Sequence, residues 1–226
     1  MVNRDAAALD DPVGASLRGH HAHLARSLGG AAAYRPGVAT FATVNGDPAA
    51  WADLARLLGR GELADMFSST ATPPADWEPV FVHEGRQLVW DGTEAEGDPG
   101  VVELGAADVP AMLELVARTR PGPFLPRTRE LGTYLGIRQG GALVAMAGER
   151  LHPPGWTEIS AVCTAPEARG QGHAARLVAA LTARITARGE SPFLHVAAAN
   201  TGAIALYERL GFETRKPVTF RGYRTP

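Results

Sequence analysis

Two glycines stand among polar side chains at a point where a strand-like apolar run passes into a helical pattern. The six residues are Arg169, Gly170, Gln171, Gly172, His173 and Ala174. The first turn of a helix has backbone N–H groups with no internal partner, and the helix dipole is positive there. Because glycine has no side chain to keep a ligand away from those donors, the pattern indicates a binding site for a diphosphate.

The spacing discriminates between kinds of diphosphate ligand. A P-loop would end in Gly-Lys-Ser/Thr, and this segment has neither the lysine nor the hydroxyl. A dinucleotide fingerprint needs a third glycine, and Ala175 stands at that position. The pattern R/Q-x-x-G-x-G/A is filled by Arg169, Gly172 and Ala174. It resembles the coenzyme A pyrophosphate loop of the GNAT superfamily of acyl-CoA-dependent N-acyltransferases.

A second motif lies downstream in the order that this family shows. Its matching residues are Asn200, Ala203, Leu206, Tyr207, Gly211 and Phe212, which are similar to the family pattern N-x-x-A-x-x-L-Y-x-x-x-G-F. Upstream, Glu158 and residues 162–166 resemble the family's fourth strand and its exit. Two motifs in the right order are a specific signal, and the resemblance covers about residues 100–220.

The resemblance implies both a fold and an activity. The fold class would be α/β (α+β), with a mixed central sheet flanked by helices. The activity would be transfer of an acetyl or other acyl group from acetyl-CoA, as co-substrate, to a primary amine of a small molecule or peptide, by direct attack in a ternary complex. A coenzyme-A-binding regulatory or sensing module without turnover is the alternative.

The same resemblance assigns the residues that would hold coenzyme A. Residues 169–174 would bind the diphosphate. Backbone groups of Val162, Cys163 and Thr164 would bind the pantetheine arm where the fourth and fifth strands splay apart. Asn200 would cap the following helix, bind the pantetheine, or do both. Cys163 itself is expected to be a packed strand residue, because no activating base is visible beside it.

Acyl transfer to an amine also needs an acid and a base. Tyr207 matches the family tyrosine that protonates the departing thiolate. Glu158 is the expected base, directly or through water, with Glu149 as the second choice and a purely structural charge as the alternative. In the proline-rich stretch upstream, Phe124 and Arg127 would contact the acceptor, although an arginine there could equally be a surface charge.

Strands and helices must position these residues, and the periodicity of the apolar residues predicts their order. Apolar residues between positions 174 and 185 recur at helical spacing and form one stripe that would face a sheet. The expected order is strand 101–104, a helix after Asp108, a hairpin about residues 140–141, strand 156–163, the helix from 174, strand 193–197 and the helix after Asn200.

The first part of the chain, residues 1–95, alternates strand and helix signals and carries no chemical motif. We expect a smaller α/β domain here, of unknown role or as a degenerate half-copy of the same fold, and the acyltransferase domain at 99–226. Residues 91–100 are the best linker candidate. Asp11-Pro12 predicts a helix start with apolar residues continuing to Leu28, and residues 79–90 predict a hairpin about Glu84-Gly85.

Composition limits the remaining classes. With 226 residues and a formal net charge of −2, the chain can bury a core but has no basic stripe for nucleic acid. A single cysteine excludes an internal disulfide. The run His20-His21-Ala22-His23 is expected to be a helix face, not a metal site. No membrane span or leader is visible, so a cytoplasmic monomer or homodimer is expected.

Overall fold

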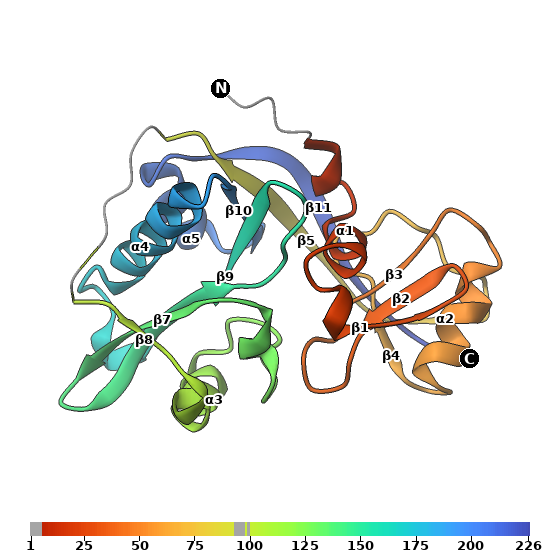
Figure 1. Ribbon diagram of the computed structural model, residues 1–226, viewed down its shortest axis with the longest axis horizontal. Helices are drawn as coiled ribbons and strands as arrows, with labels where there is room; N and C mark the ends of the chain where they lie inside the picture. Colours follow the sequence, from red (N-terminus) through yellow and green to blue (C-terminus); the bar gives the residue numbers. More distant parts are fainter. Residues whose placement is uncertain (1–5, 93–97, 99) are drawn as a thin grey trace.

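The computed structural model describes residues 6–92, 98 and 100–226. They form an eight-stranded mixed sheet, flanked by helices, and a separate three-stranded antiparallel sheet (Figure 1). The order of the large sheet is β4-β11-β5-β10-β9-β8-β7-β6. Its strands are β4 (Leu63–Asp65), β5 (Glu78–Trp90), β6 (Val102–Glu103), β7 (Tyr134–Gln139), β8 (Ala142–Glu149), β9 (Trp156–Thr164), β10 (Ser191–Ala197) and β11 (Phe212–Arg224). The expected fold class is confirmed.

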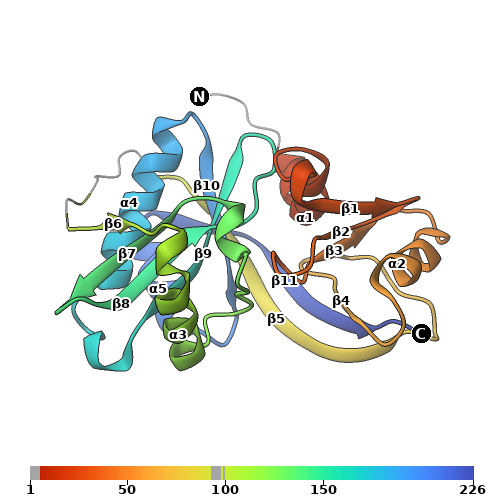
Figure 2. The same cartoon turned by 60° about the horizontal axis from the view of Figure 1, so that its bottom comes forward.

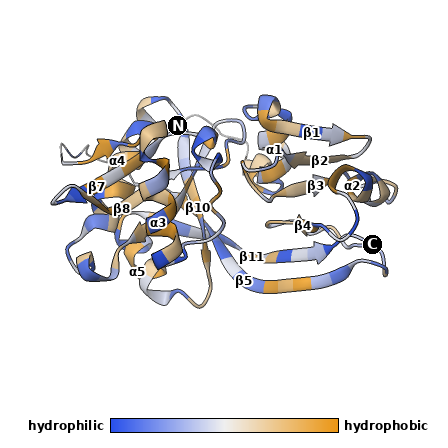
Figure 3. Ribbon diagram, turned by 90° about the horizontal axis from the view of Figure 1, so that it is seen from below, coloured by the Kyte–Doolittle hydropathy of each residue, from blue (hydrophilic) through white to orange (hydrophobic). Residues whose placement is uncertain are grey.

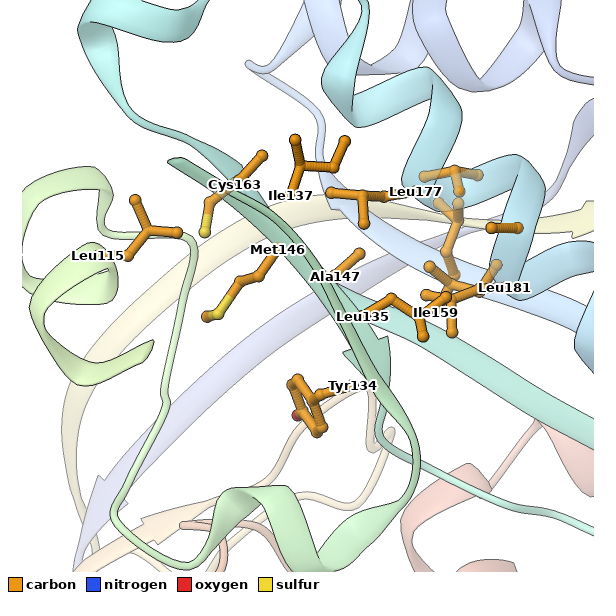
Figure 4. Close-up of a cluster of buried hydrophobic side chains, with 14 of the residues drawn as sticks. Leu115, Tyr134, Leu135, Ile137, Met146, Ala147, Ile159, Cys163, Leu177 and Leu181 are labelled. Carbon is orange, nitrogen blue, oxygen red and sulfur yellow. The ribbon is translucent and has the colours of Figure 1, made fainter. Parts of the chain in front are cut away.

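Helices cover both faces of this sheet. They are α3 (Val109–Thr119), α4 (His173–Ala187) and α5 (Thr201–Arg209). Figure 4 shows Leu115 of α3 beside Met146 and Cys163, and Leu177 and Leu181 of α4 on the other side of the strands. In Figure 3 the hydrophobic colour lies on the strands and on the helices packed against them. Among the residues that the structure describes, no helix is both long and apolar enough to cross a membrane.

The sheet opens between β9 and β10. These parallel strands pair only from Trp156 and Ser191 to Ile159 and Leu194. Just beyond that point β9 has an irregular register against β8, and Ala161 takes the left-handed φ of 53°. Such a bulge bends a strand and leaves backbone groups outside the ladder. The splay expected from the resemblance alone is therefore present.

The smaller sheet belongs to the N-terminal part. Its elements are α1 (Pro12–Arg18), β1 (Ala25–Leu28), β2 (Ala31–Tyr34), β3 (Ala42–Val44) and α2 (Ala50–Leu58). The Asp11 side chain accepts from Gly14 N at 3.0 Å, so the predicted helix start is present. The helix ends at Arg18 and not near Leu28, because the chain turns at Gly19 and passes through a short 3-10 helix, Ala22–Leu24, into β1.

The N-terminal part also enters the large sheet. Strand β5 is one continuous strand and not the predicted hairpin; Gly85 lies within it, where a side chain would collide with the Phe220 ring. It pairs with β11 over nearly its whole length and with β10 on its other edge. Figure 2 shows β5 and β11 as a long curved ribbon that continues from the large sheet beneath the small one. The sheet thus runs across the predicted boundary, and most of the predicted linker, at 93–97 and 99, lies outside the described residues.

Candidate functional site

A cavity of about 820 Å³ opens at the splay between β9 and β10. One side is lined by residues 159–164 of β9, by Arg169, and by Asn200 and Tyr207 of α5. The other side reaches the N-terminal part, where Phe41, Asp65 and Phe67 line it. The cavity therefore connects the part of the chain that carries the motifs to the part that carries none.

The glycine turn stands next to this cavity and is open to solvent. Gly170 and Gly172 have φ values of 77° and 76°, and α4 begins directly after them at His173. Apart from the glycine itself and its two chain neighbours, no heavy atom of the described residues lies within 4 Å of a Cβ built on either glycine. The first helical N–H bonded back to the turn is that of Arg176, which donates to Gly172 O at 3.1 Å. A diphosphate can therefore reach the earlier N–H groups of the turn.

Neighbouring side chains hold the shape of the turn. Gln139 Nε2 donates to Gln171 Oε1 at 2.8 Å and lies 3.2 Å from His173 Nε2. Arg169 Nε donates to Thr164 O at 3.4 Å. Because Thr164 ends β9, this bond ties the turn to the strand whose backbone borders the cavity. The residues predicted for the diphosphate and for the pantetheine arm are thus brought together.

Tyr207 of α5 and Asn200, the residue before this helix, lie at the same cavity. Burial raises the pKa of Tyr207 to about 12, so its phenol keeps its proton at neutral pH. Asn200 caps the helix by accepting from Ala203 N at 3.2 Å. Cys163 is buried, and burial raises the pKa of its thiol, so it packs and is not activated.

Glu158 lies beneath the cavity wall and is fully buried. Arg150 Nε and Nη2 donate to its two carboxylate oxygens at 2.7 and 2.6 Å, and His195 Nδ1 lies 2.6 Å from Oε1. Burial raises its pKa, but Arg150 and His195 outweigh this effect and lower the pKa to about 2. Arg150 and His195 line the cavity, whereas Glu158 does not. Its carboxylate is therefore ionised at neutral pH and bonded to Arg150 and His195.

Three further predicted residues are placed away from the cavity. Glu149 is buried and accepts from Thr133 N at 3.0 Å and from Arg188 at 2.8 Å. Phe124 packs edge-on against the Tyr134 ring in the core. Arg127 is exposed and forms an ion pair with Glu130. The proline-rich stretch instead reaches the cavity through residues 119–123.

Sequence patterns did not reveal the aromatic and charged side of the cavity. It is lined by Phe41, Asp65, Phe67, Phe81, His83, Arg150, His195 and Phe220. Arg150 lies over the rings of Phe41 and Phe67, at 5.0 and 4.5 Å from their centroids. The only local signal was His195, a polar residue inside an otherwise apolar strand.

The histidine run does not lie on a helix face as expected. His20 and His21 meet His152, with one ligand atom of each within 4.8 Å of the others. His21 already has both nitrogens engaged, by Leu131 O at 2.9 Å and Tyr34 Oη at 2.8 Å. The rings of His20 and His152 are stacked, so their in-plane lone pairs do not converge on one point.

The chain is similar to known acetyltransferases. The model of the FR47-like protein family matches residues 134–221. N-alpha-acetyltransferase RimI of Mycobacterium tuberculosis is 36% identical over 130 residues, which are 51% of this chain and 81% of that protein.

Two solved structures extend the likeness to both parts of the chain. A protein of Novosphingobium aromaticivorans assigned to the GNAT acetyltransferases is 40% identical, with a TM-score of 0.89, over 96% of this chain and 98% of its own. A GCN5-related N-acetyltransferase of Kribbella flavida shares the fold at a TM-score of 0.61 and 21% identity, over 96% of this chain and 95% of its own.

Proposed function

Because this chain belongs to the GNAT superfamily of acyl-CoA-dependent N-acyltransferases, we propose that it moves an acetyl group from acetyl-CoA to a primary amine. The amine attacks the thioester directly while both substrates are bound. The observation that carries the proposal is the open glycine turn at the start of α4, placed beside a cavity that enters the splay between β9 and β10. We further propose a cytoplasmic enzyme, monomeric or homodimeric.

Residues of the splay and the turn would hold coenzyme A. The N–H groups at the start of α4 and the turn residues 169–174 bind the diphosphate. Backbone groups of residues 162–164 lie beyond the last β9–β10 pair, Ile159 and Leu194, and bind the pantetheine amides on that side of β9. An N–H in the same segment polarises the thioester carbonyl as the tetrahedral intermediate forms. Asn200 caps α5 and faces the arm.

Tyr207 would supply the proton that the departing thiolate needs. Its phenol lines the cavity and stays protonated at neutral pH. Proton donation by a positioned side chain lowers the barrier because the leaving thiolate need not carry a full charge.

Glu158 takes a positioning role in this proposal. Both of its oxygens accept charged or ring N–H donors, and its pKa of about 2 makes it a weak base. It fixes Arg150 and His195, whose side chains face the cavity. The acceptor amine loses its proton to water in the cavity before it attacks.

The acceptor is a small-molecule or peptide amine. The Mycobacterium tuberculosis relative is named for acetylation of α-amines, which makes a peptide N-terminus one class to test. Phe124 and Arg127 lie away from the cavity, so the acceptor would instead contact the loop 119–123 and the N-terminal part.

Two measurements on the full chain test the proposal. Titration calorimetry with coenzyme A should show saturable binding. Mixing the protein with acetyl-CoA and a panel of amines should release free thiol only when an accepted amine is present. Coenzyme A binding without thiol release for any amine would favour the regulatory module instead, and no binding would reject both functions.

A further inference from the structure

Asp65 is a buried carboxylate that the N-terminal part contributes to the cavity. It is the last residue of β4, pairs with Gly222 of β11, and is 4% exposed. Its Oδ2 accepts from Thr40 Oγ1 at 2.7 Å. Within the described part of the chain its Oδ1 has no hydrogen-bond partner, although the residue lines the cavity.

The charges at this end of the cavity do not balance. Arg150 gives two hydrogen bonds to Glu158, so these two form a closed pair. Asp65 forms no ion pair within 4.0 Å among the described residues. Arg150 also acts on Asp65 electrostatically, but one cation then serves two carboxylates, so Arg150, Glu158 and ionised Asp65 together carry a net charge of −1. A buried carboxylate is costly unless a cation or several donors meet it. A cationic ligand would supply the missing partner.

The walls around Asp65 suit a cation attached to an apolar skeleton. Four of the seven phenylalanines of the chain line this cavity, namely Phe41, Phe67, Phe81 and Phe220. Ring centroids are 4.7 Å apart for Phe41 and Phe67 and 4.8 Å apart for Phe67 and Phe220. The Arg150 guanidinium lies over the rings of Phe41 and Phe67, so this aromatic wall already contacts one cation.

We propose that Asp65 binds the acceptor in its ammonium form, before that group loses its proton and attacks the thioester, while Phe81 and Phe220 contact the carbon skeleton that carries it. The preferred acceptors are then primary amines with an apolar or aromatic body. This inference rests on the proposed acetyl transfer and names the acceptor class of the same cavity. It also gives the N-terminal part a role, because this part supplies Asp65 and three of the four rings. The fourth ring, Phe220, lies in β11.

Calorimetry on the protein saturated with coenzyme A tests the inference. Phenethylamine and phenethyl alcohol have the same body and differ in the cationic group. The wild type should bind the amine about tenfold or more tightly than the alcohol, and Asp65→Asn should abolish this difference. Glu84→Gln removes an exposed carboxylate from β5 outside the cavity and should leave both affinities unchanged.

Several results would overturn the inference. Asp65→Asn should bind phenethyl alcohol as wild type does. If it also binds phenethylamine as tightly as wild type, Asp65 is not the ammonium site. A wild type that binds both probes equally, or neither, contradicts the acceptor class even if the variant does not fold. Coenzyme A binding and thiol release with any other amine, such as a peptide N-terminus, are measured in parallel, so failure of the acceptor class is distinguished from failure of acetyl transfer.

Discussion

Tyr207 is the residue whose place and pKa fit proton donation. Its ring lines the cavity, and burial raises its pKa to about 12. We expect Tyr207→Phe to lower kcat by about 100-fold to 10,000-fold, because the thiolate must then leave without a proton donor. The affinity for coenzyme A, measured by calorimetry, should stay within about twofold. An unchanged kcat would assign the acid to another group.

Glu158 should matter first for stability. It is fully buried and holds Arg150 and His195 in place. Glu158→Gln removes the charge that compensates Arg150, and breaking a buried pair in this way costs about 3–5 kcal/mol. Urea unfolding measures the loss. A variant with wild-type stability and no activity would instead return Glu158 to the role of base.

Asp65 should make the stability of the folded protein depend on pH, and its replacement should be stabilising at high pH. Burial raises its pKa from 3.8 to about 6, so its proton stabilises the folded state at low pH and that stability is lost as the pH rises through about 6. Asp65→Asn should therefore be as stable as wild type near about pH 4 and more stable near about pH 8, by on the order of 2–3 kcal/mol. Arg150 and Glu158 keep their charges over this range, and burial lowers the pKa of His195, so it is neutral at the upper end.

Urea unfolding of both proteins at the two pH values is the measurement. Equal stabilities at the higher pH would show that Asp65 is not an uncompensated buried charge in the free protein.

At the residue scale, short local motifs pointed to side chains that lie close together in the structure. Tyr207, Asn200 and Arg169 belong to such motifs and line one cavity, and the glycine turn follows Arg169 directly. Asp65, Arg150 and His195 meet only because distant strands of one sheet lie side by side. No spacing along the chain encodes that meeting, so sequence analysis missed them.

At the scale of elements, one glycine precedes α4 and another follows it in the same backbone conformation. The second can therefore serve as a control for substitutions of the first. Gly172 and Gly189 have φ values of 76° and 78°, and a Cβ on either would meet nothing within 4 Å. Alanine at each position should cost about 1–2 kcal/mol, because L-residues disfavour this conformation. Only Gly172→Ala should also weaken coenzyme A binding, by about tenfold, since it displaces N–H donors of the turn.

Calorimetry with coenzyme A on both variants decides this point. Equal affinities would mean that the turn does not contact the ligand.

Elements were predicted best where periodicity and motif agree. The strand, turn and helix from β9 to α4 follow the expected order, because the apolar stripe of α4 is local information. The hairpin predicted about Glu84-Gly85 is wrong, because pairing with β10 and β11 overrides a turn signal. Gly85 serves close packing of Phe220 and not a reversal of the chain.

At the scale of the whole molecule, the two parts should unfold together. Strands β4 and β5 precede the predicted linker yet pair with β11, which ends the chain. We expect one cooperative transition by calorimetry and by circular dichroism, with coincident midpoints. Two separated transitions would show that the N-terminal part folds independently of the large sheet. Sequence analysis placed the boundary by composition, which carries no information about pairing between distant strands.

Saturation with coenzyme A should raise the stability of this unit as a whole. A ligand at 100 times its dissociation constant adds about 2.7 kcal/mol. A thermal shift that grows with coenzyme A concentration, and is smaller for Gly172→Ala than for Gly189→Ala, is the expected result. An absent shift would contradict binding at the turn.

The most direct test of acetyl transfer follows both products in one reaction. The wild-type chain is incubated with acetyl-CoA and a panel of amines that includes phenethylamine and a peptide with a free N-terminus, while free thiol and the mass of each amine are recorded. We predict that thiol release equals the amount of an amine that has gained one acetyl group. Coenzyme A binding with no acetylated product from any amine would contradict the account.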